Sequence, residues 1–256
     1  ANAVDSITTG DYNVGVGDGA LTATTSGSRN TAIGYTALST NTTGDYNVGI
    51  GDSALYTNLT GSANTGLGYQ ALLFNTTASN NTGVGYHALR ANTTGAGNVA
   101  IGKGALDANT TASSNNGIGL NAMGANTTGS DNVGIGVNAL GANTTGGSNN
   151  ALGSDSLAAN TTADANTAMG SNSLRTNTTG ANNTAVGYSA LRYNTTADNN
   201  TAFGHSALTA NTTGAQNVSV GNTSLYDNTT GTYNTATGYL ALGNNTTADY
   251  NSSFGG

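Results

Sequence analysis

Residues 183–199 read NTAVGYSALRYNTTADN, and the same phrase begins again at Asn200. Steps of 17 residues from Asn41 meet an Asn twelve more times, ending at Asn245, and two steps backward reach Thr24 and Ile7. The chain therefore holds fifteen repeats with no insertion between them. A fixed period of this length predicts a solenoid, because each repeat buries its apolar side chains only against its neighbours.

Three positions of the repeat hardly vary. With the Asn of Asn-Thr-Thr as position 1, position 7 is Asn and position 11 is Gly in all fifteen repeats. Position 15 is Leu in every repeat from Leu21 onward except one, which has Met123. We expect Gly at position 11 to allow a positive φ or a tight bend.

The composition of the repeat favours strands over helices. Gly, Asn and Thr fill most positions, and each costs about 0.5–1 kcal/mol against Ala in a helix interior. In the phrase Asn-Thr-Ala-Val-Gly, positions 8 and 10 share one face of a strand, and we expect that face to be the core. Ala or Ser at position 14 and Leu at position 15 supply a second inward group, so that Val186 and Leu191 lie inside.

These features predict an all-β fold, a parallel β-solenoid or β-roll of fifteen coils with 17 residues each. We expect one repeat domain, residues 1–256, uncapped at both ends. A longer period of 85 residues, or five coils, also runs through it, as Ala78, Ala163 and Ala248 at position 4 show. Duplication of five-coil blocks explains this period, and so does a lateral partner that contacts every fifth coil.

Identical residues in consecutive coils can stack into ladders. We expect position 7 to form a structural ladder that bonds backbone groups at a bend, made of Asn13, Asn30, Asn47, Asn64, Asn81, Asn98, Asn115, Asn132, Asn149, Asn166, Asn183, Asn200, Asn217, Asn234 and Asn251. Core residues at position 15 include Leu38, Leu55, Leu72, Leu89, Leu106, Leu140, Leu191 and Leu208.

The charge pattern excludes several classes of partner. Only 7% of the residues are charged, and the formal net charge is −7 with five basic residues. Without a basic stripe we expect no nucleic acid, and without an apolar run of about 20 residues we expect no membrane insertion. Cys and Trp are absent, which suits an extracellular protein, at a cell surface or on a virion.

Groups for catalysis do not converge in this repeat. His87 and His205 occupy different positions in coils seven apart, so they cannot form one site. Asp is too sporadic for a calcium-binding solenoid, and the Gly-x-Gly phrases recur with the coil instead of opening a helix. We therefore expect no enzyme activity, no metal site and no cofactor.

The Asn-Thr-Thr segment permits three interpretations. It is an Asn-x-Thr glycosylation sequon, but glycans spaced by about 4.8 Å would collide. It could form an outward Asn/Thr array suited to ice, or Thr could simply favour strands. If Thr at position 2 points inward, the candidates for glycosylation or for the outward array include Asn41, Thr43, Asn92, Thr94, Asn143, Thr145, Asn194 and Thr196.

Charged residues respect the expected stacking with one exception. No two of the Asp residues at position 5 fall in consecutive coils, where like charges would destabilise the stack. Arg175 and Arg192 do fall in consecutive coils at one position. We expect these long side chains to splay apart.

Units such as residues 64–72 (NTGLGYQAL) followed by residues 75–77 (NTT) resemble the 17-residue repeats of phage tail-fibre and bacterial surface proteins that often end in an endosialidase-type chaperone domain. The Asn-Thr-Ala-Val-Gly core is also similar to repeats in the heads of trimeric autotransporter adhesins. That second resemblance implies a left-handed β-roll and a homotrimer.

From these resemblances and the uninterrupted period we expect a non-enzymatic structural shaft of an extracellular fibre or filament. Its partners would be copies of itself, in a trimer or a head-to-tail filament, with a cell-surface glycan as a further possible ligand. The alternative is an ice-binding protein that uses the outward Asn/Thr array.

Overall fold

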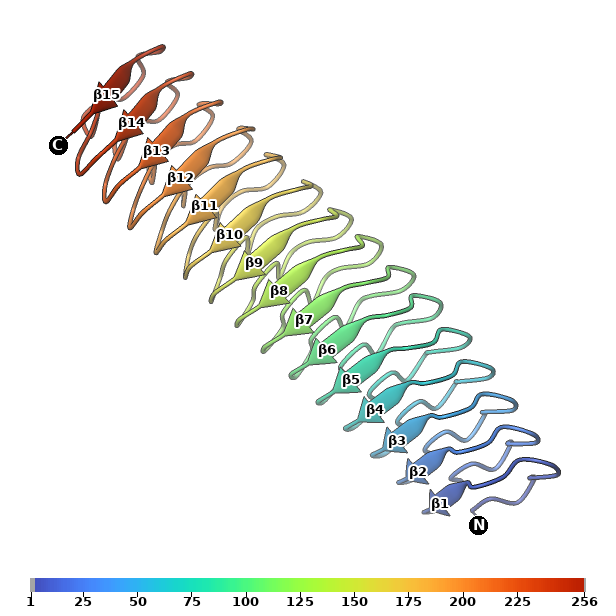
Figure 1. Cartoon of the computed structure of the whole chain (residues 1–256). Coiled ribbons are helices and arrows are strands. Elements are labelled where there is room, and N and C mark those ends of the chain that lie inside the picture. Colours follow the sequence, from blue (N-terminus) through green and yellow to red (C-terminus); the bar gives the residue numbers. More distant parts are fainter. Residues whose placement is uncertain (1–2, 256) are drawn as a thin grey trace. The chain divides into compact units, whose positions relative to one another are not determined.

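A computed structural model describes residues 3–255, and its regular structure consists of strands alone (Figure 1). Each coil contributes one strand of three residues at positions 8–10. The strands are β1 (Val14–Val16), β2 (Thr31–Ile33), β3 (Val48–Ile50), β4 (Thr65–Leu67), β5 (Thr82–Val84), β6 (Val99–Ile101), β7 (Asn116–Ile118), β8 (Val133–Ile135), β9 (Asn150–Leu152), β10 (Thr167–Met169), β11 (Thr184–Val186), β12 (Thr201–Phe203), β13 (Val218–Val220), β14 (Thr235–Thr237) and β15 (Ser252–Phe254).

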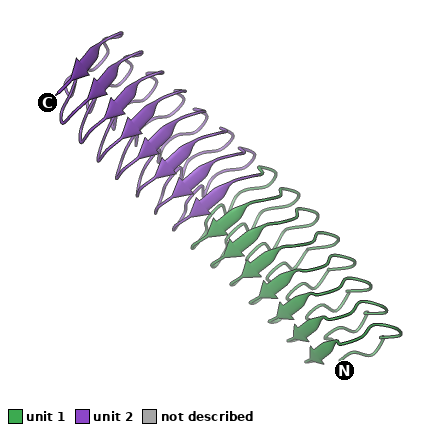
Figure 2. Ribbon diagram, in the orientation of Figure 1, with its two compact units in different colours: residues 1–130 green, residues 131–256 purple. Residues whose placement is uncertain are grey.

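The chain divides into two compact units, Ala1–Ser130 and Asp131–Gly256 (Figure 2). The first contains β1–β7 and the second β8–β15. Within each unit the strands pair in chain order and in parallel, and every residue faces the one 17 positions along, as Val48 faces Thr65. The predicted parallel β-solenoid with 17-residue coils is therefore confirmed.

The interior of each coil is built from Leu at position 15 and small residues at positions 14 and 9. Leu38, Leu106 and Leu191 have no exposed surface, and the Ala residues that precede them are equally buried. All eight leucines named above lie in this core.

The expected core face of the strand is wrong. Position 9 points inward, so Ala185 is buried, whereas Val186 is partly exposed and Leu152 exposes 42% of its surface. The coil is too thin for the opposite arrangement. Even a single Cβ added at Gly49 would lie 3.2 Å from Leu38 Cγ, so the interior accepts only a small residue there.

The backbone reaches this thin shape through left-handed turns. Gly at position 11 has φ between 107° and 139° throughout, and a Cβ added at Gly187 would overlap the carbonyl oxygen of Gly204. Leu at position 15 is also left-handed, with φ of 51° at Leu38. That conformation costs about 1–2 kcal/mol for an L-residue. Full burial of the side chain, which contributes about 1.5–3 kcal/mol, offsets the cost.

Candidate interaction surfaces

The Asn residues at position 7 form a ladder in the core of each unit. Asn47 is buried, and its Oδ1 accepts the backbone N–H of Asn64 at 3.0 Å. Its Nδ2 donates to the carbonyl oxygen of Gly61 at 2.8 Å. Each such side chain thus joins its own coil to the next through two hydrogen bonds, which satisfies the backbone at the bend before the strand.

The Asn residues at position 1 form a second buried ladder. Asn58 Nδ2 donates both to Asn41 Oδ1 at 2.9 Å and to the carbonyl oxygen of Gly61 at 2.8 Å. The expectation that Asn41, Asn92, Asn143 and Asn194 point outward is therefore wrong, since all four have no exposed surface. Burial pays off because the short amide satisfies a turn carbonyl of its own coil and the amide of its neighbour.

The Thr residues after this ladder do reach the surface. Thr43, Thr94, Thr145 and Thr196 at position 3 are exposed. Position 2 does not point inward as expected: it is half-exposed in most coils, and Thr178 Oγ1 donates to the carbonyl oxygen of Thr195 at 3.0 Å. The outward array is therefore made of Thr alone.

A third ladder at position 5 was not predicted. The backbone N–H of Ser28 donates to Asp45 Oδ1 at 2.7 Å, and the N–H of Asp45 donates to Ser62 Oγ at 3.0 Å. Asp and Ser alternate here because each provides a short acceptor for the coil before it. The alternation was visible in the sequence, but we read it only as avoidance of like charges.

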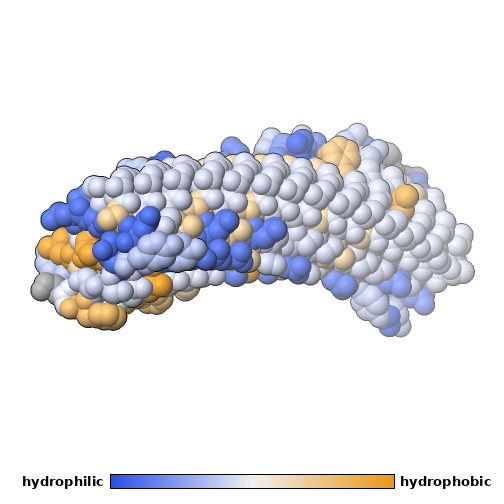
Figure 3. Space-filling view, turned by 90° about the horizontal axis from the view of Figure 1, so that it is seen from above, coloured by the Kyte–Doolittle hydropathy of each residue, from blue (hydrophilic) through white to orange (hydrophobic). Residues whose placement is uncertain are grey.

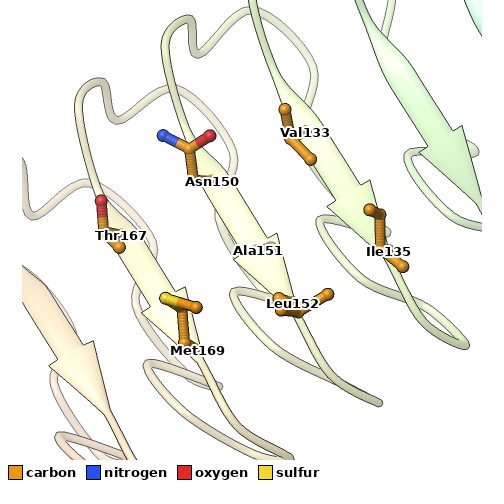
Figure 4. A pocket seen from close by; sticks show the side chains of 7 residues that line it. All are labelled: Val133, Ile135, Asn150, Ala151, Leu152, Thr167 and Met169. Atoms are coloured by element: carbon orange, nitrogen blue, oxygen red, sulfur yellow. The ribbon is translucent and has the colours of Figure 1, made fainter.

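The outward face of the strands is the main apolar surface of each unit. In the second unit, β8, β9 and β10 enclose a shallow pocket of about 290 Å³. Figure 4 shows two rows of side chains on it, with Val133, Asn150 and Thr167 in one and Ile135, Leu152 and Met169 in the other. We call the outward residues of positions 8 and 10 the sheet face. In the first unit it includes Leu67 and Ile101, each about 40% exposed.

Figure 3 shows a different balance over the rest of the surface that it draws. Most of that view is near neutral in hydropathy, and hydrophobic or hydrophilic residues gather in separate patches. This fits a chain in which only 7% of residues are charged and in which Thr, Ser and Gly fill the turns.

An aromatic cluster in the first unit surrounds His87. The rings of Tyr69 and Tyr86 stack with centroids 5.3 Å apart, and the His87 ring lies 3.9 Å from that of Tyr86. Next to them, Arg90 Nε contacts Asp107 Oδ1 at 2.9 Å. Burial, followed by the positive charge of Arg90, lowers the pKa of His87 below its ordinary value of 6.5.

A related cluster lies in the second unit. Tyr188 stacks on His205 with ring centroids 5.4 Å apart, and the guanidinium of Arg192 lies 5.0 Å from the centre of the Tyr193 ring. His87 and His205 thus each stack on a Tyr of their own unit. Tyr residues at positions 6 and 12 are exposed, as expected; they include Tyr12, Tyr35, Tyr188 and Tyr239.

Residues 3–255 contain no group of three or more His, Cys, Asp or Glu side chains able to hold a metal ion. The same residues include no helix of the length and hydrophobicity that crossing a bilayer requires. Comparison with protein-family models, with curated proteins and with solved structures gave no match. The resemblance of the repeats therefore remains an expectation, and the surfaces must carry the functional argument.

Proposed function

We propose that this protein is a non-enzymatic structural shaft of an extracellular fibre or filament, similar to a phage tail fibre or a surface adhesin. It provides length and stiffness and assembles with copies of itself. The observation that carries the proposal is the sheet face, an apolar surface that continues from strand to strand within each unit.

Three ladders support the part of the proposal that concerns stiffness. In every coil, side chains at positions 1, 5 and 7 supplement the backbone hydrogen bonds of the strand, as Asn58, Asp45 and Asn47 do. Buried amide networks whose groups are all paired hold one arrangement of the chain. A coil tied to its neighbour at so many points resists bending and local opening.

The sheet face supports the part that concerns assembly. Leu152 and Met169 each expose more than 40% of their surface beside a pocket whose walls are almost entirely apolar. Large contiguous apolar patches on soluble proteins mark interaction sites. A second copy of the chain offers the same apolar rows, so that face-to-face association in a dimer or trimer buries both.

Electron microscopy together with light scattering tests this function. We expect elongated particles whose mass is a multiple of 25.0 kDa. The variant Ile135→Lys/Leu152→Lys/Met169→Lys should shift the mass toward the monomer and keep the elongated outline. The matched variant Thr128→Lys/Thr145→Lys/Thr162→Lys changes exposed residues of the same coils and should leave the mass unchanged. Compact globular particles would contradict the shaft, and a monomeric parent chain would contradict assembly.

The exposed Thr column favours a second candidate, ice binding. Position 3 is Thr in fourteen coils and Ser26 in the other, so hydroxyl and methyl groups recur at the coil spacing of about 4.8 Å. Thermal hysteresis and the shape of ice crystals test this candidate. We expect Thr111→Lys, in the middle of the column, to abolish any activity, and a parent chain without activity would remove the candidate.

A further inference from the structure

Two arginines of the second unit occupy the same position in consecutive coils. Arg175 and Arg192 both stand at position 16. The backbone N–H and the hydroxyl of Thr176 donate to the carbonyl oxygen of Arg192 at 3.1 and 3.0 Å, so the two coils are joined at this point. Side chains in neighbouring coils start about 4.8 Å apart, which brings two positive charges into one small area.

Neither guanidinium has a carboxylate partner among the residues that the structure describes. The neighbouring coils supply Tyr, His, Ser and Thr around the pair, and the nearest residues at positions 12 and 13 of the same coils are uncharged: Ser171, Asn172, Tyr188 and Ser189. Two like charges at about 5 Å repel each other, even where water screens them. An anion between them would turn this repulsion into two attractions.

The same position in the first unit shows how such a site is normally filled. Eighty-five residues earlier, position 16 carries Arg90 and Asp107, and these two form an ion pair at 2.9 Å. Arg175 therefore corresponds to Arg90, whereas Arg192 stands where the carboxylate of Asp107 would be expected. The second unit keeps the cation and replaces its internal anion with a second cation.

Arg192 is also held in place before any ligand arrives. Its Nε is buried and has no hydrogen-bond partner, although a buried donor without an acceptor costs free energy. Its guanidinium packs 5.0 Å from the centre of the Tyr193 ring, which limits its freedom. An external oxyanion that reached Nε would satisfy the donor, and the planar fork of Arg suits the two oxygens of a carboxylate or sulfate.

We propose that Arg175 and Arg192 bind one carboxylate or sulfate group of an acidic polysaccharide. The exposed rings of Tyr188 and Tyr193 flank the pair and provide apolar surface for the sugar. Because the chain has only three other basic residues and a net charge of −7, it offers no track for a continuous phosphate backbone. The site therefore fits an isolated anionic group on a sugar chain, and this binding goes beyond the structural role proposed above.

Binding of defined polysaccharides to the full chain tests the proposal. Heparin supplies sulfate groups and polygalacturonate supplies carboxylates alone, so the two separate the possible anions, while dextran is the neutral control and single-stranded DNA supplies phosphate. We expect the parent chain to bind heparin, polygalacturonate or both, and not dextran. The variant Arg175→Gln/Arg192→Gln should lose at least about tenfold in affinity, or about 1.4 kcal/mol.

Arg29→Gln is the matched control, because Arg29 is an exposed arginine that lies near Tyr46 in the first unit. It should bind as the parent does, and circular dichroism should show that both variants remain folded. No binding of either acidic polysaccharide, or equal loss in the Arg29 variant, would overturn the proposal. DNA binding as tight as that of the polysaccharides would overturn the assignment to a sugar chain.

Discussion

The pair Arg90 and Asp107 in the first unit and the pair Arg175 and Arg192 in the second differ by one residue of opposite charge in otherwise equivalent coils. Both pairs stand one residue after the buried leucines of their coils, Leu106 and Leu191 among them. The comparison teaches that the coil is a fixed frame whose outward positions can change charge without altering the core. Each outward position is therefore a separate functional variable.

The largest expected effect concerns the frame that the two regions share. Leu106→Ala and Leu191→Ala should each lower the free energy of unfolding by about 2–5 kcal/mol, because each leaves a cavity where the side chain is fully buried. Denaturant titration measures both. If the two losses differed by more than about 1 kcal/mol, the frames would not be equivalent. Thr111→Ala and Thr196→Ala, both exposed, serve as controls and should cost far less.

The ladder provides a second test of equivalence, at a smaller cost. Asn98→Ala and Asn183→Ala each remove an acceptor for the next coil, at 3.0 Å to the N–H of Asn115 and at 2.9 Å to that of Asn200. Each should cost about 1–3 kcal/mol, because a buried N–H loses its partner. Thermal or denaturant unfolding checks this, and a near-neutral result would mean that water replaces the amide.

A charge exchange tests the difference between the two regions. Arg192→Asp should create an ion pair with Arg175 like that in the first unit and remove the affinity for acidic polysaccharide by about tenfold or more. Asp107→Arg should give the first unit a second cation beside Arg90 and add a site. Stoichiometry from isothermal titration separates the outcomes. Unchanged stoichiometry in Asp107→Arg would show that paired arginines alone do not suffice.

The smallest expected effect is a pH dependence confined to the first unit. The pKa of His87 is lowered in the folded chain, mainly by burial, so the unfolded chain takes up a proton first as the pH falls. The contribution of His87 is therefore fully present above pH 6.5 and is lost as the pH falls through the lowered pKa. His87→Gln should flatten that part of the curve of thermal midpoint against pH. An unchanged curve would assign the dependence to other groups.

The period, the parallel stacking, the left-handed Gly at position 11 and the leucine core follow from the sequence, because stacking imposes the same demand on every coil. The facing of the strand does not follow. A strand of three residues has one alternation, and Val186 looks more suited to a core than Ala185. Only the volume left between Leu at position 15 and the two Asn ladders decides that the small residue lies inside.

The surfaces divide in the same way. Burial of Asn41 and Asn194 could not be predicted, since Asn is usually exposed, and its two acceptors belong to a turn and to another coil. Exposure of Thr43 follows the expected outward array. The contrast between Asp107 and Arg192 was present in the sequence, but its meaning depends on the contact of Asp107 with Arg90, which only the structure provides.

The direction of the hydrogen bonds determines how such a stack responds to mechanical load. Those of the strands and of the Asn ladders join each coil to the next, and none of them spans several coils. A force that pulls a terminal coil off the stack therefore breaks the bonds of one coil at a time. Each event releases 17 residues, or about 60 Å of extended chain. A long stack of this kind absorbs energy in many equal steps and yields gradually under tension.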